Sequence, residues 1–505
     1  MNINNKKLAG SIISVSSIVL LSKIFGFVRQ IVMADAFGAT IDTDIISLAQ
    51  GLVTNVDYII VQSLMTAFVP TYIHLKAEGE SRENIFMTKT LIICFLGSFL
   101  LAFMMMVLST PLSKIIAPSY SSNLSAELTK YIWINAPVLV FIVLTALYNA
   151  LLKSNEIFVP GELVGLIQSI IYICFIVAFG NYWGPRTLVV AFYFSAITNL
   201  AYLMIYSRKI WGFRFSTGII DPDVRRLLNM MTPLILGYSM IFLNQEIDAI
   251  IVSGLGDGVV TAMSYAAVLS NFVSTFIGSV CGVLFTYVTQ KIAEKDDSHA
   301  AELLNSSSIY LITLVLPISI IFLMNSNDIV LIVFGHGNFG KAAIDNCSYA
   351  LFGYSFMYVP YVVREMFSRF QYGYGDSKQP MINSVIAIII NTILSIILSM
   401  FFGVMGVTFA TSVSVITCSI LNVLSSKKKN GKLAFDSYAR ILPFWIAGSL
   451  ICVCVSLFFG RIFVALNELT RLLLVTLFSL IGYGIVNMSI IKQFILMMTN
   501  REIRR

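Results

Sequence analysis

Two basic residues lie inside the first long apolar stretch of the chain, where a charge is costly. Lys23 and Arg29 flank Gly26 within residues 8–34. Charges at this depth in a bilayer usually face a cavity or a partner. Six residues are about 240° of helical rotation, so an ideal helix separates the two side chains by roughly 120°. Because a guanidinium grips phosphate in bidentate fashion, the pair predicts a phosphate-binding anion site. The alternative is that both side chains extend to the membrane interface.

Three acidic residues also lie in apolar surroundings. Asp57 falls in the second predicted helix and is the simplest ionic partner for Lys23 or Arg29, whereas Glu246 and Asp248 fall in the seventh. This arrangement of charge suits an anionic substrate and a coupling cation. A structural ion pair across a cavity is the competing interpretation.

The composition excludes a water-soluble fold. Of 505 residues, 57% are hydrophobic and only 12% are charged, and the mean hydropathy is +0.86. Soluble domains are about one quarter charged. The net charge of +7 matches the basic loops of membrane proteins and gives no reason to expect nucleic acid as a partner.

Stretches free of charged residues predict about fourteen transmembrane helices. A span needs ~20 mostly apolar residues. The first helix is residues 8–34, and the run 379–426 counts as two helices broken at Gly403 and Gly406. The other stretches are 58–75, 90–113, 131–152, 163–185, 187–207, 227–245, 258–290, 303–327, 346–363, 441–460 and 472–491. They are continuously apolar rather than alternating, which favours an all-α polytopic membrane protein over a barrel.

Loop charges predict the orientation. With the N-terminus inside, 25 of the 33 Lys and Arg residues lie at inside ends and six lie at outside ends. This positive-inside bias predicts that both termini are cytoplasmic.

The chain also repeats itself. A shift of 218 residues overlays the first two helices on the seventh and eighth without a gap, so that Phe37-Gly38 falls on Leu255-Gly256. Six helices per copy give both copies the same orientation. We therefore expect an N-lobe at 1–215, a C-lobe at 216–430 and two extra helices at 431–505.

Enzymatic signatures are weak. Residues 335–340 match G-x-G-x-x-G but lie between membrane helices with no βαβ unit, and the three histidines are scattered among loops. No P-loop sequence occurs, and no segment between helices reaches 40 residues. The sequence predicts a transporter rather than an enzyme.

Several motifs, in order, resemble those of MurJ-type lipid II flippases, which belong to the multidrug/oligosaccharidyl-lipid/polysaccharide exporter superfamily. The similar segments cover nearly the whole chain. They are residues 22–29 (SKIFGFVR), 36–39 (AFGA), 67–70 (AFVP), 253–258 (SGLGDG), 334–339 (FGHGNF) and 374–380 (YGDSKQP).

The resemblance implies site residues. Arg29 corresponds to a basic cavity residue that engages pyrophosphate, Lys23 stands where the family usually has Arg, and Arg364 matches a basic position of the tenth helix. The last two helices imply a groove for the lipid tail, at 431–505. The family's sodium site maps onto Asp248, Asn391, Ser395, Val407 and Thr411, with Asp248, Asn391 and Thr411 as the expected oxygen donors and Ser395 in place of a second carboxylate.

The chain also departs from the family. Paired arginines of the second helix fall on Val56 and Asp57, and an arginine of the eighth falls on Val268. Fewer cations weaken or redirect the binding of a pyrophosphate lipid, so a divergent paralogue for another polyprenyl-linked glycan stays open. A cation-coupled exporter that uses Asp57, Glu246 and Asp248 as proton-linked acids is the second alternative. A membrane glycosyltransferase and a non-transporting scaffold are less favoured.

We accordingly expect a bacterial inner-membrane flippase that moves an undecaprenyl-pyrophosphate-linked precursor outward by alternating access, with lipid II as the first candidate. No cofactor is expected, although coupling to Na⁺, H⁺ or the membrane potential is. The expected partners are the lipid-linked oligosaccharide, membrane lipids and envelope-synthesis enzymes, and the expected oligomeric state is a monomer. Asp57 joins Lys23, Arg29 and Arg364 as an expected substrate-binding residue.

Overall fold

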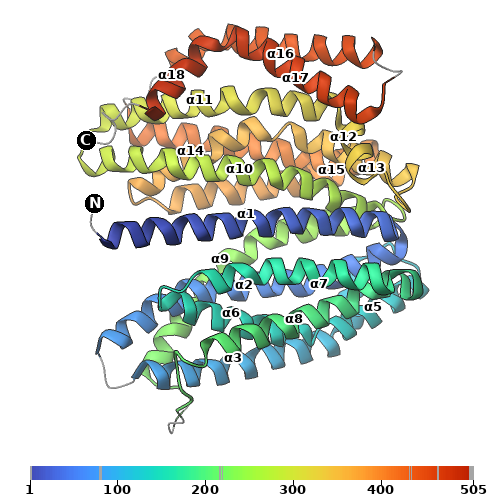
Figure 1. Ribbon diagram of the computed structural model, residues 1–505, viewed down its shortest axis with the longest axis vertical. Helices are drawn as coiled ribbons and strands as arrows, with labels where there is room; N and C mark the ends of the chain where they lie inside the picture. Colours follow the sequence, from blue (N-terminus) through green and yellow to red (C-terminus); the bar gives the residue numbers. More distant parts are fainter. Residues whose placement is uncertain are drawn as a thin grey trace. The chain divides into compact units, whose positions relative to one another are not determined.

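The protein is all-α in the part that the structure describes. This computed structural model describes residues 3–78, 82–214, 218, 220–431, 433, 435–462 and 466–499, and the described residues form helices without strands. Nine helical stretches among them are long and apolar enough to cross a membrane. The predicted all-α polytopic membrane fold is confirmed (Figure 1).

Contacts divide the chain into two compact units, which are described separately. Unit 1 is Met1–Thr261 with Gly337–Phe339, and unit 2 is Ala262–His336 with Gly340–Arg505. The predicted lobes, by contrast, divide the chain by its internal repeat, and that division stays a prediction.

Unit 1 contains the first nine α-helices and the start of the tenth. They are α1 (Ile3–Phe37), α2 (Ile41–Glu78), α3 (Arg82–Val107), α4 (Ser109–Ile116), α5 (Ser122–Asn135), α6 (Val138–Ser154), α7 (Val159–Trp183), α8 (Thr187–Ser207) and α9 (Pro222–Ser253), with a 3-10 turn at Gly184–Arg186.

Unit 2 contains the remaining helices. They are α10 (Val259–Ala293), α11 (Asp297–Met324), α12 (Ser326–Phe334), α13 (Lys341–Ser355), α14 (Tyr358–Gly373), α15 (Lys378–Lys429), α16 (Asp436–Ile462), α17 (Glu468–Val486) and α18 (Met488–Thr499).

The observed helices differ from the predicted spans in where they break and where they begin. Five predicted spans are each divided into two consecutive helices, for example α5 and α6, whereas α15 joins two spans across a kink. At the kink Gly403 has φ 57° and ψ −136°, a conformation that favours glycine, so the predicted break is confirmed. Helix α2 starts at Ile41 rather than at 58, because membrane helices continue through charges such as Asp57 that a charge-free window excludes.

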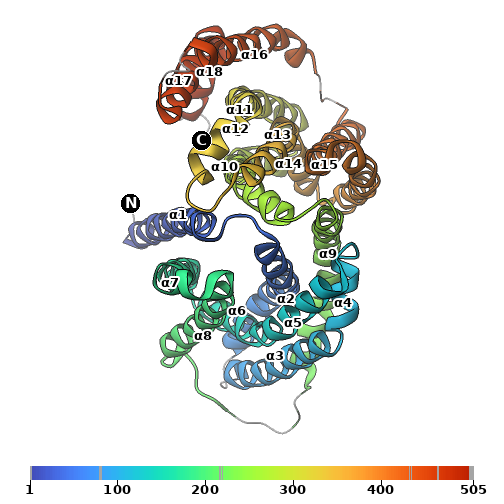
Figure 2. The same cartoon turned by 90° about the vertical axis from the view of Figure 1, so that its right-hand side faces the viewer.

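Helix α1 packs along α7 through small side chains (Figure 2). A Cβ on Gly26 would lie 3.9 Å from the Ser169 hydroxyl, and one on Gly165 would lie 4.0 Å from Cβ of Ser22. The Ser22 hydroxyl also donates to the Glu162 carbonyl at 3.1 Å. Small residues four apart on each helix allow this close approach in lipid, where backbone proximity replaces the hydrophobic effect.

Within the segment that satisfied the glycine motif, Gly337–Phe339 form a packed turn that belongs to unit 1. The Asn338 backbone N–H donates to the Asp35 carbonyl at 2.9 Å, and its side-chain amide donates to the Ala36 carbonyl at 2.6 Å. Gly38 (φ 64°) and Gly337 (φ 54°) leave no room for a Cβ at this contact. The glycines therefore serve a close backbone approach.

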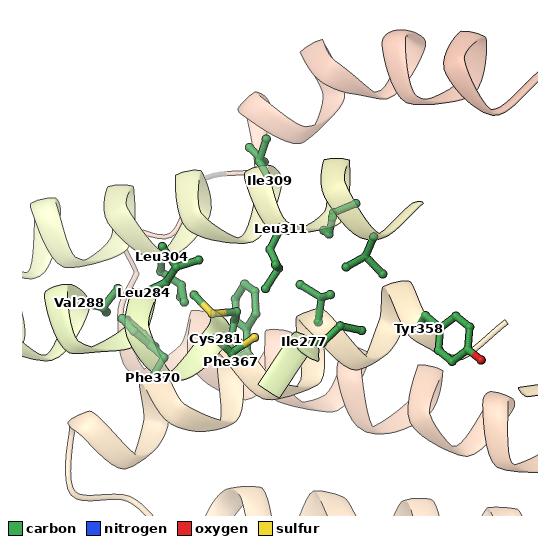
Figure 3. Packing of buried hydrophobic residues seen from close by; sticks show 14 of the residues in the cluster. Ile277, Cys281, Leu284, Val288, Leu304, Ile309, Leu311, Tyr358, Phe367 and Phe370 are labelled. Atoms are coloured by element: carbon green, nitrogen blue, oxygen red, sulfur yellow. The ribbon is translucent and has the colours of Figure 1, made fainter. Parts of the chain in front are cut away.

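Unit 2 has a hydrophobic core formed by α10, α11 and α14 (Figure 3). Ile277, Cys281, Leu284 and Val288 recur on one face of α10 at helical spacing and are buried to 5% exposure or less, as are the core residues of α11 and α14. This side of α10 is consequently occupied by packing and not by a site.

Helices α16, α17 and α18 pack on α11 (Figure 1). The Trp445 indole N–H donates to the Thr313 hydroxyl at 2.8 Å, and Arg471 on α17 pairs with Asp328 on α12 at 2.8 Å. Polar side chains thus fix the C-terminal helices to unit 2.

Candidate functional site

The two basic residues of α1 occupy different environments. α1 is one helix from Ile3 to Phe37, so Lys23 and Arg29 keep the angular separation of an ideal helix. Lys23 is exposed, whereas Arg29 is half-buried and its guanidinium carbon lies 5.1 Å from the centre of the Tyr172 ring on α7. The ring attracts the cation and limits its rotamers. The sequence did not single out Tyr172, which no local motif marks.

Polar groups also join α2 to α9 within unit 1. The Asn55 side-chain amide donates to the Glu246 carboxylate, and Tyr58 packs edge-on against Tyr238 with ring centres 6.2 Å apart. Sequence reasoning found Glu246 but missed Asn55, because an uncharged amide in a helix gives no signal without a known neighbour.

Asp57 lies on α2 between Asn55 and Tyr58, the two residues that contact α9. It is half-buried, and its Oδ1 atom is buried and accepts no hydrogen bond from the residues that the structure describes. A buried carboxylate oxygen without a donor is unfavourable, which is typical of a functional position rather than a packing role. Its predicted pairing with Lys23 or Arg29 stays a prediction.

The five residues that map onto the sodium site belong to two units. Asp248 on α9 in unit 1 is 7% exposed. In unit 2, α15 carries the buried Asn391, Ser395 and Val407 and the half-buried Thr411, whose hydroxyl donates to the Val407 carbonyl at 3.2 Å.

The chemistry of these donors fits a hard cation. A carboxylate, an amide oxygen and hydroxyls are all oxygen ligands, and no softer ligand is present in the set. No group of three or more His, Cys, Asp or Glu residues suited to a metal occurs among the described residues. Taken singly, these oxygen donors are of the kind that hard cations accept.

Helix α14 in unit 2 carries two arginines that differ in their contacts. Arg369 pairs with Glu365 at 3.2 Å and donates to the Gly278 carbonyl of α10 at 3.5 Å. Arg364 is half-buried, and its guanidinium carbon lies 5.5 Å from the centre of the Tyr361 ring. Arg364 thus resembles Arg29 in resting on an aromatic face, whereas Arg369 is committed to packing.

An apolar groove of about 370 Å³ lies among α11, α14 and α16. Its lining is apolar except for the indole N–H of Trp445 and the hydroxyl of Ser449, and it comprises Ile312, Leu316, Val359, Leu442, Trp445, Ile446, Ser449, Leu450 and Val453. A hydrocarbon chain is the chemistry that such a surface can accept.

Known proteins resemble this chain over most of its length. The family model "Lipid II flippase MurJ" matches residues 33–496. A probable lipid II flippase MurJ of Rickettsia prowazekii is 25% identical over 409 residues, which cover 79% of each chain. One of Vibrio cholerae is 22% identical over 440 residues, which cover 81% of each chain.

Solved structures show the same fold. A lipid II flippase MurJ in an inward closed conformation has a TM-score of 0.81 at 20% identity, covering 95% of this chain and all of its own. An inward-facing multidrug-resistance MATE transporter has a TM-score of 0.67 at 13% identity, covering 83% of this chain and 98% of its own. The chain is a multi-pass membrane transporter and not an enzyme. It belongs to the lipid II flippase MurJ family.

Proposed function

We propose that this chain translocates lipid II from the inner to the outer leaflet of the bacterial inner membrane by alternating access. The observation that carries the proposal is Arg29 of helix α1, a half-buried guanidinium held against the Tyr172 ring in a chain from this family. A fixed guanidinium in a poorly hydrated site suits a diphosphate, because bidentate charge-assisted hydrogen bonds are strongest there.

The basic residues have distinct roles in this proposal. Arg29 binds the diphosphate with its rotamer limited by Tyr172, and the exposed Lys23 adds a mobile positive charge. Arg364, resting on Tyr361, is proposed as a contact of the C-terminal half. Arg369 is excluded from substrate binding because Glu365 already neutralises it.

Coupling is assigned to the acidic residues. Moving negative charge outward across an inside-negative membrane is favourable by about 2.3 kcal/mol per charge per 100 mV. Resetting the empty carrier requires the reverse motion. We propose that bound Na⁺ favours this motion, with oxygen ligands from Asp248, Asn391 and Thr411. Ser395 and Val407 are the other two positions that map onto the family's sodium site. Asp57 is proposed to compete with the diphosphate for the α1 cations and so to assist release.

The lipid tail is assigned to the C-terminal helices. The apolar groove among α11, α14 and α16, of which only the α16 side belongs to the predicted tail segment 431–505, would hold isoprenoid units while the sugar headgroup crosses. The orientation with both termini cytoplasmic, the monomeric state and contacts with envelope-synthesis enzymes belong to the same proposal.

Gene replacement tests the substrate. The chromosomal lipid II flippase of a rod-shaped bacterium is replaced by this gene under a titratable promoter, and membrane expression is checked by immunoblot. Growth at near-normal rate is expected. A membrane-inserted protein that gives no growth would reject lipid II and direct attention to another polyprenyl-linked glycan, as the residues Val56, Asp57 and Val268 allow.

A further inference from the structure

A basic cavity lies at the start of α9, outside the site described above. It has a volume of about 540 Å³ and is lined entirely by residues 220–230 of unit 1. Arg225, Arg226 and Asn229 supply donor groups, and Ile220, Pro222 and Met230 supply apolar walls. Its size is within the range of small-molecule binding sites.

The nearby carboxylates are already paired with other cations. Asp221 also lines the cavity, but it bonds the Lys89 ammonium at 2.8 Å and accepts the Val224 N–H at 2.9 Å. Partial burial raises the pKa of Asp221, yet the hydrogen bonds from Lys89 and Val224 outweigh it and hold that pKa below its usual range. Asp223 pairs with Arg82 at 2.9 Å. Both acids are therefore paired with cations other than Arg225 and Arg226.

The positive charges of Arg225 and Arg226 are available to a ligand. Neither Arg225 nor Arg226 has an ion pair or side-chain hydrogen bond in the part of the chain that the structure describes, and both are exposed. Asn229 follows Arg225 by one helical turn on the same face of α9, Arg226 is the next residue after Arg225, and all three line the cavity. Such a set of donors is suited to a phosphate group.

The apolar walls indicate what carries the phosphate. Ile220 is 64% exposed beside the cavity, and Met230 continues the apolar wall toward the membrane-spanning part of α9. A free phosphate gains nothing from contact with these apolar surfaces, whereas the glycerol and first methylenes of a phospholipid can pack against them. Basic pockets beside transmembrane helices at the cytoplasmic surface commonly bind anionic headgroups.

We propose that this cavity binds the headgroup of an anionic membrane phospholipid, with Arg225, Arg226 and Asn229 on its phosphate and Ile220 and Met230 along its glycerol and upper acyl chain. The bound lipid would hold the start of α9 at the membrane surface. The proposal is independent of which lipid the protein transports.

Titration of the purified full-length protein with phosphatidylglycerol in detergent, with bound lipids counted by native mass spectrometry, tests the proposal. The double variant R225Q/R226Q is expected to weaken the tightest phosphatidylglycerol site about thirtyfold, since two basic residues near such a surface together contribute about 2 kcal/mol. The control R208Q/K209Q removes a different pair of neighbouring basic residues, which directly follow α8 and do not line the cavity, and is expected to bind as the wild type does.

Three outcomes would overturn the proposal. One is unchanged phosphatidylglycerol binding in R225Q/R226Q, and another is an equal loss in R208Q/K209Q, which would indicate general surface charge. The third is displacement of the lipid by inorganic phosphate at equal concentration, which would assign the cavity to a soluble anion. Undecaprenyl pyrophosphate is titrated in parallel. Loss of its binding alone would assign the arginines to the transported lipid and would likewise reject the phospholipid.

Discussion

Polar residues within the helices make different kinds of contact in the two units. In unit 2, Gln371, Asn383 and Asn422 are buried and donate to one another or to serine hydroxyls of α14 and α15, for example from Asn383 to the Asn422 side chain at 2.7 Å. In unit 1, Arg29 rests on an aromatic face and a buried oxygen of Asp57 has no donor among the described residues.

This difference separates two uses of polar groups in a membrane protein. A neutral amide network rigidifies the helices that contain it. Charged groups held by weaker contacts remain able to exchange partners, which a carrier needs during each cycle. Substitutions at residues of both kinds should therefore differ in their effects on transport and on stability.

The largest difference is expected between two half-buried arginines. Arg29→Gln should lower lipid II transport about 100-fold because it removes a charge-assisted contact to a poorly hydrated diphosphate, while leaving the thermal unfolding midpoint nearly unchanged. Arg369→Gln should lower the thermal unfolding midpoint and leave lipid II transport nearly unchanged, since it leaves Glu365 without its partner. Transport per folded molecule and thermal unfolding are measured for both. A similar transport loss in the two variants would break the comparison.

Asn422 tests the amide network. Asn422→Ala leaves the Asn383 amide without its Asn422 acceptor and the Ser368 hydroxyl without a donor from this residue, so we expect a loss of about 2–3 kcal/mol in the free energy of unfolding. The folded fraction should transport normally. Denaturant titration in detergent measures the first quantity, and Ser425→Ala, which removes a single hydroxyl from the edge of the network, is the milder control.

Asp57 tests the incompletely bonded acid. Asp57→Asn should reduce transport about tenfold if this acid promotes release of the diphosphate, and it should stabilise the fold by about 1 kcal/mol because a buried charge is removed. Single-turnover release measures the first effect. A destabilised variant would show instead that Asp57 holds a structural partner.

The smallest effect is expected at Asp221. Its pKa is lowered in the folded protein, so its contribution to stability is present above the unfolded pKa of about 3.9 and is lost as the pH falls through the lower folded value. Asp221→Asn should lower the free energy of unfolding by about 1 kcal/mol at pH 7. Below about pH 4 the variant should lose less stability with falling pH than the wild type does. Unfolding midpoints of wild type and variant converge on acidification, and a constant gap would contradict the assignment.

The sequence predicted the fold through composition more than through local signals. Continuous apolar stretches predicted the helices, and Gly403 predicted the kink of α15. The predicted start of α2 was wrong because Asp42, Asp44 and Asp57 lie within the helix, so a stretch free of charged residues begins after its true start. Helix ends depend on tertiary partners that a hydropathy window does not contain.

The candidate site was only partly predictable. Lys23, Arg29 and Arg364 stand out because charge is rare in apolar helices. Their aromatic supports, Tyr172 and Tyr361, do not, since tyrosine is common in such helices and the contact with Arg29 spans more than 140 positions of sequence. The same reason hid Asn55, whose meaning comes entirely from Glu246.

The most direct test of the central claim is the amount of lipid II at the outer face of cells that depend on this protein. Cells depleted of their own flippase are given a hydrolase that cleaves lipid II but cannot cross the membrane, and the cleaved fraction is quantified. With the intact chain, cleavage should approach that of undepleted cells, and with Arg29→Ala nearly all lipid II should stay protected. Equal cleavage with both versions, or protection with the intact chain, would contradict the account.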